Sequence, residues 1–339
     1  MGARMRKGLL ALVSVLVGLL FAGMTVWGTL ALWFALPFTD TARAVVALGY
    51  VVVAGYAIWR ILRRRRPVVS ILPYALATLA LFAWWSTIEP SNERQWQPDV
   101  KILAAAEIDG DFVTMRNIRS FSYRSETAYT PRWYDKTVDL RDLDSLDLIA
   151  VYWMGDAIAH TILSFGFGGE RVAISIEIRK ELEETYSSLA GLFRRYELYY
   201  VVGDESDLIG LRTTYREPPE DVYLYRVKVP LENVRALFLQ YVAKINELHS
   251  DPEFYNTATT NCTTNIVTHV EAFKENVPWS WKMLLSGYFP ELVYERGSLD
   301  QTHPFDVLQS YSLINELAVA ADGSADFSRR IREGLPGMP

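Results

Sequence analysis

The sequence of 339 residues predicts an α+β domain preceded by three transmembrane helices. Two observations support this prediction. Three apolar runs within the first 86 residues are each long enough to cross a bilayer. Beyond them, segments with the spacing of strands come first and segments with the spacing of helices follow, an order typical of α+β folds.

The apolar runs follow one another along the N-terminal region. Gly8–Leu36 carries no charged residue, and the single charged residue of Ala44–Leu62 is Arg60. Pro67–Ser86 ends in aromatic residues of the kind that are common at bilayer surfaces. The first run is longer than the apolar part of a secretory signal peptide, and two more runs follow it. We therefore expect all three runs to remain in the protein as membrane spans.

Basic residues orient these spans. Arg4, Arg6 and Lys7 precede the first span and Arg63–Arg66 separate the second from the third, whereas the loop between the first and second holds only Arg43. Because positive residues stay on the cytoplasmic side, we expect a multi-pass protein of the bacterial inner membrane with a cytoplasmic N-terminus. Everything after residue 86 is then expected in the periplasm.

The remainder of the chain is acidic. Residues after 86 hold 25 Lys and Arg against 39 Asp and Glu, and this formal charge of −14 argues against a nucleic-acid partner. The acidic positions Asp139, Asp142, Asp144 and Asp147 predict a solvated face, since their spacing matches no calcium loop. The expected divisions are a three-helix anchor at 1–86, a juxtamembrane linker at 87–98, a domain at 99–310, and a C-terminal helix and tail at 311–339.

Five segments concentrate or alternate β-branched and aromatic residues, as strands do. Leu231–Leu248 is expected to be helical because its apolar residues fall on one face, and a second helix is expected to begin near Cys262. The expected strands are Asp147–Trp153, Ile158–Phe165, Arg171–Arg179, Tyr196–Val202 and Val222–Val229.

Cys262 is the only cysteine of the chain, so an intrachain disulfide is excluded. It lies in Thr259–Asn265, directly before the amphipathic stretch Ile266–Phe273. A thiol in the first turn of a helix feels the positive end of the helix dipole, which lowers its pKa and favours the thiolate. The alternative is a small buried hydrophobic side chain, but polar neighbours on both sides fit a helix start better.

The base for this thiol must come from four histidines. His269 lies seven residues after Cys262 on the same expected helix, about 10 Å along its axis, which is too far to reach the sulfur. His249 ends the preceding expected helix and is expected to cap it, and His303 lies in an expected loop. His160 therefore remains as the candidate base.

Glu177 is the candidate partner of His160. A two-residue turn at Gly168-Gly169 would pair residues whose numbers sum to 337, placing Glu177 opposite His160 with Cβ atoms about 5 Å apart. Such a carboxylate holds the imidazole in one tautomer and stabilises its charged form. The alternatives are a polar cross-strand pair at a sheet edge, or a one-residue shift of register that separates the two side chains.

The backbone N–H of Cys262 is the natural donor for an oxyanion. Asn261 is the candidate for a second donor, although an Asn at this position is more often the N-cap of the helix. We expect neither a metal site nor a cofactor, because the chain has no His-Glu-x-x-His sequence, no second cysteine and no glycine-rich phosphate loop.

Five motifs occur in the same order in this chain and in one known family. The motifs are Asn117–Phe121, Ala159–Gly166, Ser175–Arg179, Tyr196–Leu198 and Asn261–Asn265. The chain thereby resembles, over roughly residues 90–310, the extracytoplasmic domain at the N-terminus of the Lnb-type lipoprotein N-acyltransferases. That family is similar to the circularly permuted papain-like proteins, so the resemblance implies an antiparallel sheet with helices, in which the histidine strand precedes the cysteine helix.

The resemblance also implies roles and partners. Cys262 would be the nucleophile, His160 the base and Glu177 the orienting residue. The partners would be a phospholipid and a lipoprotein or envelope peptide, because the family moves an acyl chain from phospholipid to the α-amino group of a lipoprotein. One departure is that the family carries its membrane segments after the catalytic domain, whereas here the spans come first.

Three functions are therefore weighed. The first is a membrane-anchored thiol acyltransferase, the second a cysteine peptidase or amidase acting on cell-wall or envelope peptides, and the third a non-catalytic envelope-binding domain. An apolar groove beside Cys262 would favour lipid, and a narrow polar cleft would favour peptide. The apolar residues of Trp279–Phe289 are candidates for lining a groove, although core packing is the commoner role of such clusters.

Overall fold

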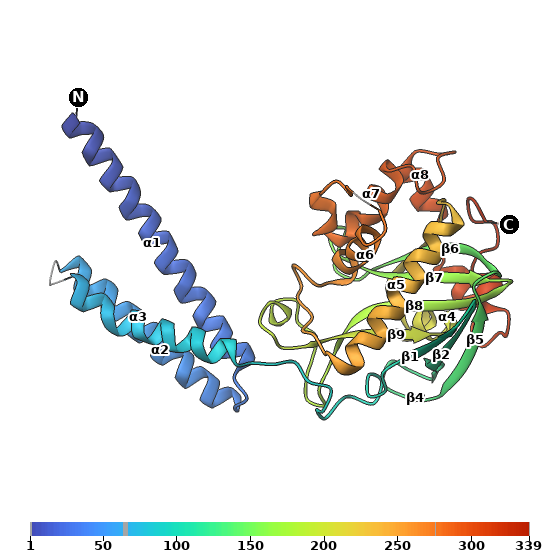
Figure 1. The fold of residues 1–339 in the computed structure, drawn as a ribbon, viewed down its shortest axis with the longest axis horizontal. Coiled ribbons are helices and arrows are strands. Elements are labelled where there is room, and N and C mark those ends of the chain that lie inside the picture. Colours follow the sequence, from blue (N-terminus) through green and yellow to red (C-terminus); the bar gives the residue numbers. More distant parts are fainter. Residues whose placement is uncertain (1, 64–66, 275, 339) are drawn as a thin grey trace. The chain divides into compact units, whose positions relative to one another are not determined.

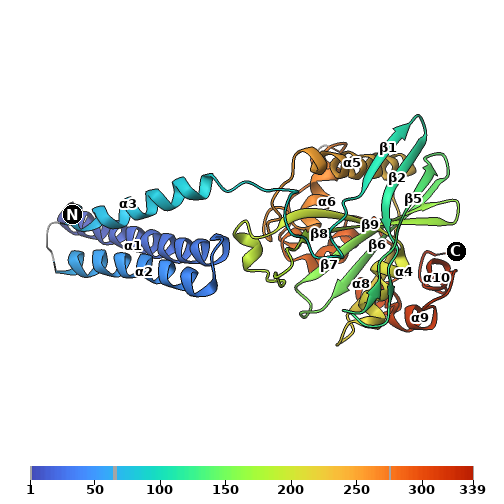
Figure 2. The same ribbon diagram turned by 90° about the horizontal axis from the view of Figure 1, so that it is seen from below.

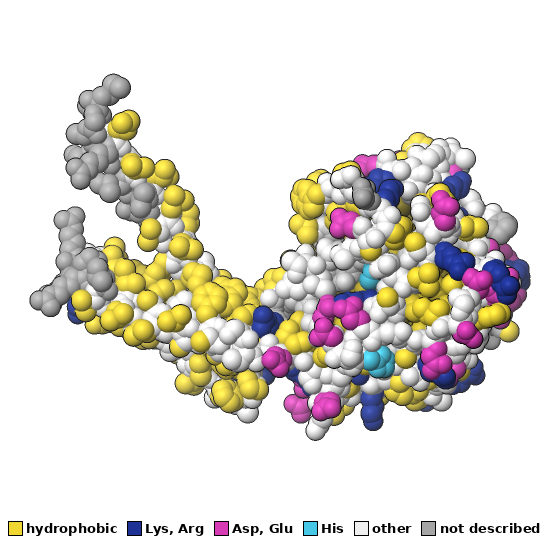
Figure 3. All heavy atoms as spheres, in the orientation of Figure 1, with side chains coloured by type: hydrophobic (Ala, Val, Ile, Leu, Met, Phe, Trp, Pro, Cys, Tyr) yellow, Lys and Arg dark blue, Asp and Glu magenta, His cyan; other side chains and the backbone are white. Residues whose placement is uncertain are grey.

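The N-terminal apolar runs form helices in a computed structural model that describes residues 2–63, 67–274 and 276–338 (Figure 1). These helices are α1 (Gly2–Ala35), α2 (Asp40–Leu62) and α3 (Pro67–Ser86). Each contains a stretch long and apolar enough to cross a membrane. Figure 3 shows hydrophobic side chains over much of the visible surface of these helices. The prediction of three potential spans is thereby confirmed.

The chain forms two structural units. The first joins Met1–Pro90 with a short segment from the middle of the chain, Ser187–Arg195, and the second contains the remaining residues. Within the first unit the helices are linked by polar as well as apolar contacts. Tyr50 Oη lies 2.9 Å from Thr78 Oγ1, and Thr25 Oγ1 lies 3.0 Å from Tyr74 Oη. Hydrogen bonds of this kind satisfy polar side chains in membrane helices, because lipid acyl chains offer no hydrogen-bonding partner.

The second unit is built on an eight-stranded sheet in the order β1-β2-β9-β8-β7-β6-β10, with β5 also pairing to β2 (Figures 1 and 2). A parallel pair joins β2 to β9, and the other pairs of this sheet in the described residues are antiparallel. The strands are β1 (Ala105–Asp109), β2 (Phe112–Arg119), β5 (Trp133–Asp139), β6 (Leu143–Tyr152), β7 (Ala159–Phe167), β8 (Glu170–Arg179), β9 (Glu197–Gly203) and β10 (Asp221–Val227). A separate small hairpin pairs β3 (Ser122–Tyr123) with β4 (Tyr129–Thr130).

Helices cover the sheet on both faces. On one face α5 (Leu231–Ser250) and α6 (Cys262–Glu271) pack on the larger apolar core. The other face carries a second core, to which the C-terminal helices contribute. The remaining helices are α4 (Glu205–Leu208), α7 (Phe289–Glu295), α8 (Phe305–Tyr311), α9 (Asn315–Ala320) and α10 (Phe327–Arg330). The predicted α+β class is confirmed.

Alternation along the strands explains the two cores. On β8, Val172, Ile174 and Ile176 enter the core beneath α5, whereas Ala173 enters the opposite core. The predicted apolar face of α5 is likewise buried, except for its first residue, Leu231, which is half exposed.

A buried ion cluster corrects the prediction of a fully solvated acidic face. Asp147 is completely buried on β6, where it accepts from Arg171 Nη1 at 3.0 Å, Arg226 Nε at 2.5 Å and Arg332 Nε at 2.9 Å. Arg332 also binds Glu205. Burial raises the pKa of Glu205, but the opposing charge of Arg332 outweighs it and lowers that pKa to about 2. The spacing of the acidic residues does not reveal this cluster, because Asp147 lies on the buried part of β6 and its three basic partners come from distant segments of the chain.

Candidate active site

The β7–β8 hairpin brings His160 and Glu177 together. Gly168 and Gly169 have φ values of 58° and 96°, which a two-residue hairpin turn of this kind requires and which glycine adopts without strain. The pairs from Phe167↔Glu170 to Ile162↔Ser175 have numbers that sum to 337, as the turn predicts. Glu177 lies two residues beyond Ser175 on the same face of β8.

A serine lies between the histidine and the carboxylate. His160 Nε2 is 2.5 Å from Ser175 Oγ, and Ser175 Oγ donates to Glu177 Oε1 at 2.8 Å. The direct separation of His160 Nε2 and Glu177 Oε1 is 3.5 Å. Sequence reasoning did not assign Ser175 a role, although its alternation with Glu177 on one strand face was the available signal.

Cys262 occupies the first turn of α6, as its neighbours predict. Asn261 is the N-cap, and a capping box with Thr264 fixes the start of the helix at Cys262. The cysteine side chain is 6 % exposed and forms a hydrogen bond with His160. The helix start therefore places the thiol within hydrogen-bonding reach of His160.

The side chain of Asn261 works as a cap. Its Oδ1 accepts from Thr264 N at 2.9 Å, and its Nδ2 donates to Thr257 O at 2.8 Å. Both ends of the amide thus hold the local backbone. Of the two roles considered for Asn261, the geometry supports the capping role.

The charges of the three groups favour an ion pair. Burial lowers the pKa of His160, but the charge of Glu177 and hydrogen bonds to Cys262 and Glu177 outweigh it and raise that pKa to about 9. Burial raises the pKa of Cys262, whereas the hydrogen bond and charge of His160, with backbone N–H groups of Thr161 and Thr263, bring it below its ordinary value. Both directions favour a thiolate–imidazolium pair at neutral pH.

Arg212 keeps Glu177 ionised. Its Nη2 donates to Glu177 Oε1 at 2.8 Å, and its Nη1 donates to Leu208 O at 2.8 Å. Burial raises the pKa of Glu177, but the charges of Arg212 and His160 hold it well below the ordinary value. Arg212 comes from the π-helical turn Leu211–Tyr215, and no local sequence pattern pointed to it.

The other histidines make contacts elsewhere. His269 Nε2 lies 2.7 Å from Tyr200 Oη, and burial lowers the pKa of His269 to about 4. His249 was expected to cap its helix; instead its Nε2 lies 2.6 Å from Ala104 O, because α5 ends beside the approach to β1.

The segment 281–288 packs closely beside His160 and Cys262. Ser286 Oγ accepts from Ala159 N at 3.1 Å, directly before His160, and Thr263 Oγ1 donates to Met283 O at 2.8 Å, directly after Cys262. Met283 and Phe289 belong to the core, whereas Trp279, Trp281, Leu284 and Leu285 are exposed. The aromatic run is thus divided between core packing and an apolar surface next to the site.

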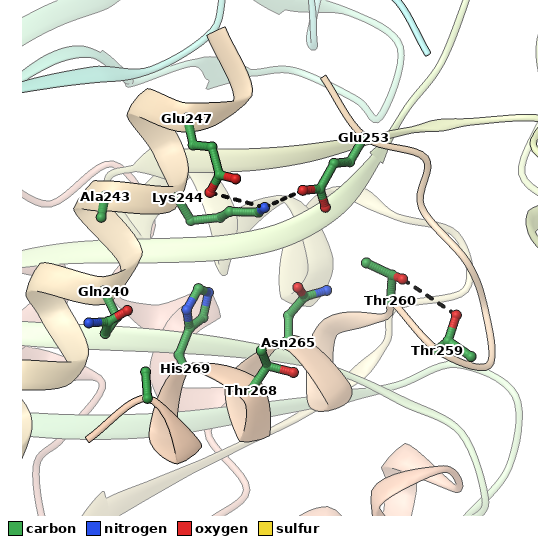
Figure 4. A pocket seen from close by; sticks show the side chains of 11 residues that line it. Gln240, Ala243, Lys244, Glu247, Glu253, Thr259, Thr260, Asn265, Thr268 and His269 are labelled. Carbon is green, nitrogen blue, oxygen red and sulfur yellow. Dashed lines mark hydrogen bonds and ion pairs between the residues drawn. The ribbon is translucent and has the colours of Figure 1, made fainter. Parts of the chain in front are cut away.

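A polar cavity of about 400 Å³ lies beside α6 (Figure 4). Figure 4 shows Lys244 between Glu247 and Glu253, with Asn265 and His269 on the neighbouring helix. Lys244 Nζ is 3.2 Å from Glu247 Oε2 and 2.5 Å from Glu253 Oε1, so the lysine offsets part of the negative charge of the two glutamates. Among the described residues, those that line this cavity include neither Cys262 nor His160.

Comparisons with known proteins give one family match, to a segment that contains the site. Among the residues that the structure covers, no group of three or more His, Cys, Asp or Glu is placed to hold a metal ion. Comparison with curated proteins found no match, and neither did comparison with solved structures. Residues 129–287 match the family model of the Lnb N-terminal periplasmic domain. This segment contains Cys262, His160 and Glu177, and the match is to the domain that the motifs of the chain resemble.

Proposed function

We propose that the protein is a membrane-anchored thiol acyltransferase that moves an acyl chain from a phospholipid to an amine, such as a lipoprotein N-terminus. The observation that carries this proposal is the hydrogen-bonded series Cys262, His160, Ser175 and Glu177, which favours a thiolate. The family match and the three apolar helices of the same chain support lipid as the acyl donor.

The first half-reaction forms a thioester. The Cys262 thiolate attacks the ester carbonyl carbon, a C–S bond forms, and the carbonyl oxygen becomes an oxyanion. Collapse of this intermediate breaks the ester C–O bond, and the leaving lysophospholipid oxygen takes the proton of the His160 imidazolium. The backbone N–H of Cys262, in the first helical turn, has no intrahelical acceptor and is available to the oxyanion.

The second half-reaction restores the ion pair. An amine attacks the thioester carbon, and neutral His160 accepts the proton that this nitrogen loses. The C–S bond breaks, an amide is released, and Cys262 leaves as a thiolate beside the protonated histidine. Glu177, held by Arg212, stabilises the imidazolium at both ends of the cycle.

The membrane spans give this chemistry a location. We propose a cytoplasmic N-terminus and a periplasmic catalytic domain at the inner membrane, because the basic residues flank the N-terminus and the loop between the second and third spans. Anchoring a phospholipid-consuming enzyme in the same bilayer as its donor raises the effective donor concentration without new contacts.

A second candidate function is a cysteine peptidase or amidase acting on envelope peptides. The polar, charged cavity between α5 and α6 is the observation that favours it, since peptides offer more polar groups than acyl chains do. Water would then resolve the thioester in place of an amine. A non-catalytic binding domain is the third alternative, and it requires an unreactive Cys262.

The test is capture of an acyl-enzyme. Full-length protein in vesicles of phosphatidylethanolamine and phosphatidylglycerol is analysed by intact mass, with Cys262→Ser as the control. We expect an added mass of one acyl chain on the cysteine protein alone, and its loss as N-acyl peptide when an amine peptide is added. Absence of the adduct across several head groups, together with cleavage of an envelope peptide, would favour the hydrolase. Failure of iodoacetamide to alkylate Cys262 at neutral pH would favour the binding domain.

A further inference from the structure

Ser187–Arg195, the insert, lies in the chain between β8 and β9 yet groups with the three apolar helices as one structural unit. Phe193 of the insert is buried: its ring stacks on Phe34 of α1 at 5.7 Å and meets Trp85 of α3 edge-on at 6.4 Å. Aromatic contacts of this kind bury a large apolar area with defined geometry. The insert is therefore packed on the ends of two potential membrane spans.

Two arginines of the insert bind the carbonyl groups that end these helices. Arg194 Nη1 donates to Trp85 O at 2.8 Å and to Ile88 O at 3.0 Å, and Arg195 Nη1 donates to Phe34 O at 3.2 Å. The last carbonyls of a helix lack intrahelical donors and carry the negative end of its dipole, so cationic donors stabilise them. Both α1 and α3 end here, which places the insert at the level of one membrane surface.

Two leucines of the insert are left uncovered. The insert contains a short 3-10 helix, Ala190–Leu192, in which side chains three residues apart lie on the same face. Ala190 and Phe193 share the buried face, whereas Leu189 and Leu192 are 45 % and 37 % exposed. Transfer of these two leucines from water into the edge of the bilayer would be favourable, because both side chains are apolar and lie at the end of a potential membrane helix.

We propose that the insert docks into the lipid leaflet that meets the C-terminal ends of α1 and α3. Leu189 and Leu192 would enter the boundary between head groups and acyl chains, and the aromatic residues beneath them match the belt that forms at this depth. The neighbouring arginines suit a surface of phosphate groups, which attracts cations. The occupant is thus a phospholipid surface.

Docking would link the membrane to the strand that carries Glu177. Residues 180–186 separate the end of β8 from the insert, so docking would tether that strand to the membrane through a short connection. This proposal does not depend on acyl transfer, because a lipid-docked insert serves a hydrolase or a binding domain equally well. Its test accordingly uses a readout that is independent of activity.

The test measures the depth of single labels in vesicles. Leu189→Cys and Leu192→Cys, each in full-length protein with Cys262→Ser, are labelled with bimane and reconstituted in phosphatidylethanolamine–phosphatidylglycerol vesicles. The control is Val319→Cys, an apolar position on α9 that is somewhat more exposed than either leucine. We expect doxyl groups on lipid acyl chains to remove most of the bimane fluorescence at both insert positions and to leave the control nearly unchanged. Aqueous iodide should show the opposite order.

A second measurement protects the conclusion from a folding defect of the labelled proteins. Trypsin cleaves after arginine, so docking should protect Arg194 and Arg195 in vesicles, and the Leu189→Glu/Leu192→Glu protein should lose that protection. Quenching equal to that of the control, or iodide access equal to that of the control, would overturn the proposal. Quenching that depends on the number of protein molecules per vesicle, and not on the fraction of doxyl lipid, would also overturn the proposal. It would indicate that a second copy of the chain covers the insert.

Discussion

The charge of Glu177 should determine the pH range in which Cys262 reacts. We consider Glu177→Gln, which keeps the shape of the side chain and removes its negative charge. The substitution leaves His160 and Ser175 in place, so it isolates the electrostatic contribution of the carboxylate. Because Cys262 and His160 share one proton, any change at the imidazole appears as a change in the thiolate population.

The size of the effect follows from the geometry. The pKa of His160 is raised from 6.5 to about 9, which corresponds to about 3 kcal/mol of preference for the charged ring. A unit charge at the 3.5 Å separation of His160 and Glu177 supplies about 5 kcal/mol at an effective dielectric constant near 20, and Arg212 offsets part of it. Loss of this charge is therefore sufficient to return the pKa of His160 to its ordinary range or below.

The assay is the rate of iodoacetamide alkylation as a function of pH, followed by intact mass on full-length protein. Wild-type protein should react at neutral pH and below, because the imidazolium stabilises the thiolate. In Glu177→Gln the imidazole is less often protonated and stabilises the thiolate less, which raises the pKa of Cys262. The midpoint of the alkylation rate against pH should therefore shift to higher pH by about two units.

A matched control separates the site from general charge effects. Glu170→Gln removes a carboxylate from the other end of β8, where the side chain is largely exposed and pairs with Lys136. We expect its alkylation profile to match the wild type. Coincident profiles for Glu177→Gln and wild type would refute the electrostatic reasoning, and an equal shift in the control would refute its assignment to Glu177.

Three further predictions concern the hydroxyl bridge and the buried ion cluster. Ser175→Ala should shift the alkylation profile in the same direction but by less than Glu177→Gln, since the direct contact of His160 with the carboxylate remains; a larger shift would contradict this. Arg332→Met should lower the free energy of unfolding in denaturant by about 3 kcal/mol, because two buried carboxylates lose a partner. The substitution Arg329→Met, at an exposed neighbour, should leave the free energy of unfolding nearly unchanged, and equal losses would refute the role of burial. Glu205→Gln should weaken the dependence of stability on acid pH. The pKa of Glu205 is lowered to about 2, so the stability that this carboxylate contributes is present above pH 4.5 and is lost as the pH falls toward 2. An unchanged acid unfolding profile, followed by circular dichroism, would contradict this.

Local sequence patterns made the placement of Cys262 and His160 predictable. An Asn-Cys sequence ahead of an amphipathic stretch predicts a cap followed by a first turn, and the structure begins α6 at Cys262. Two glycines between alternating segments predict a two-residue turn, and the turn alone fixes which residues of β7 and β8 face one another. Both features depend on a few neighbouring residues.

Long-range packing explains what the sequence did not disclose. Arg212 reaches Glu177 from a turn 35 residues away, and no periodicity relates the two positions. The strands β1, β2 and β5 escaped prediction because their faces are unevenly buried and β2 changes register between Met115 and Ile118. The expected single C-terminal helix is divided into α9 and α10, since short segments pack separately on the second core.

The buried cluster at Asp147 also sets the order in which this protein can mature. Its carboxylate needs partners from β8, β10 and the segment after α10, and Arg332 lies 185 residues further along the chain. A ribosome must therefore deliver almost the whole polypeptide before that interior charge is fully neutralised. Until then strand β6, which lies between β7 and β10, contains a buried charge without all of its partners. Folding of the domain is therefore expected to be completed after synthesis and not during it.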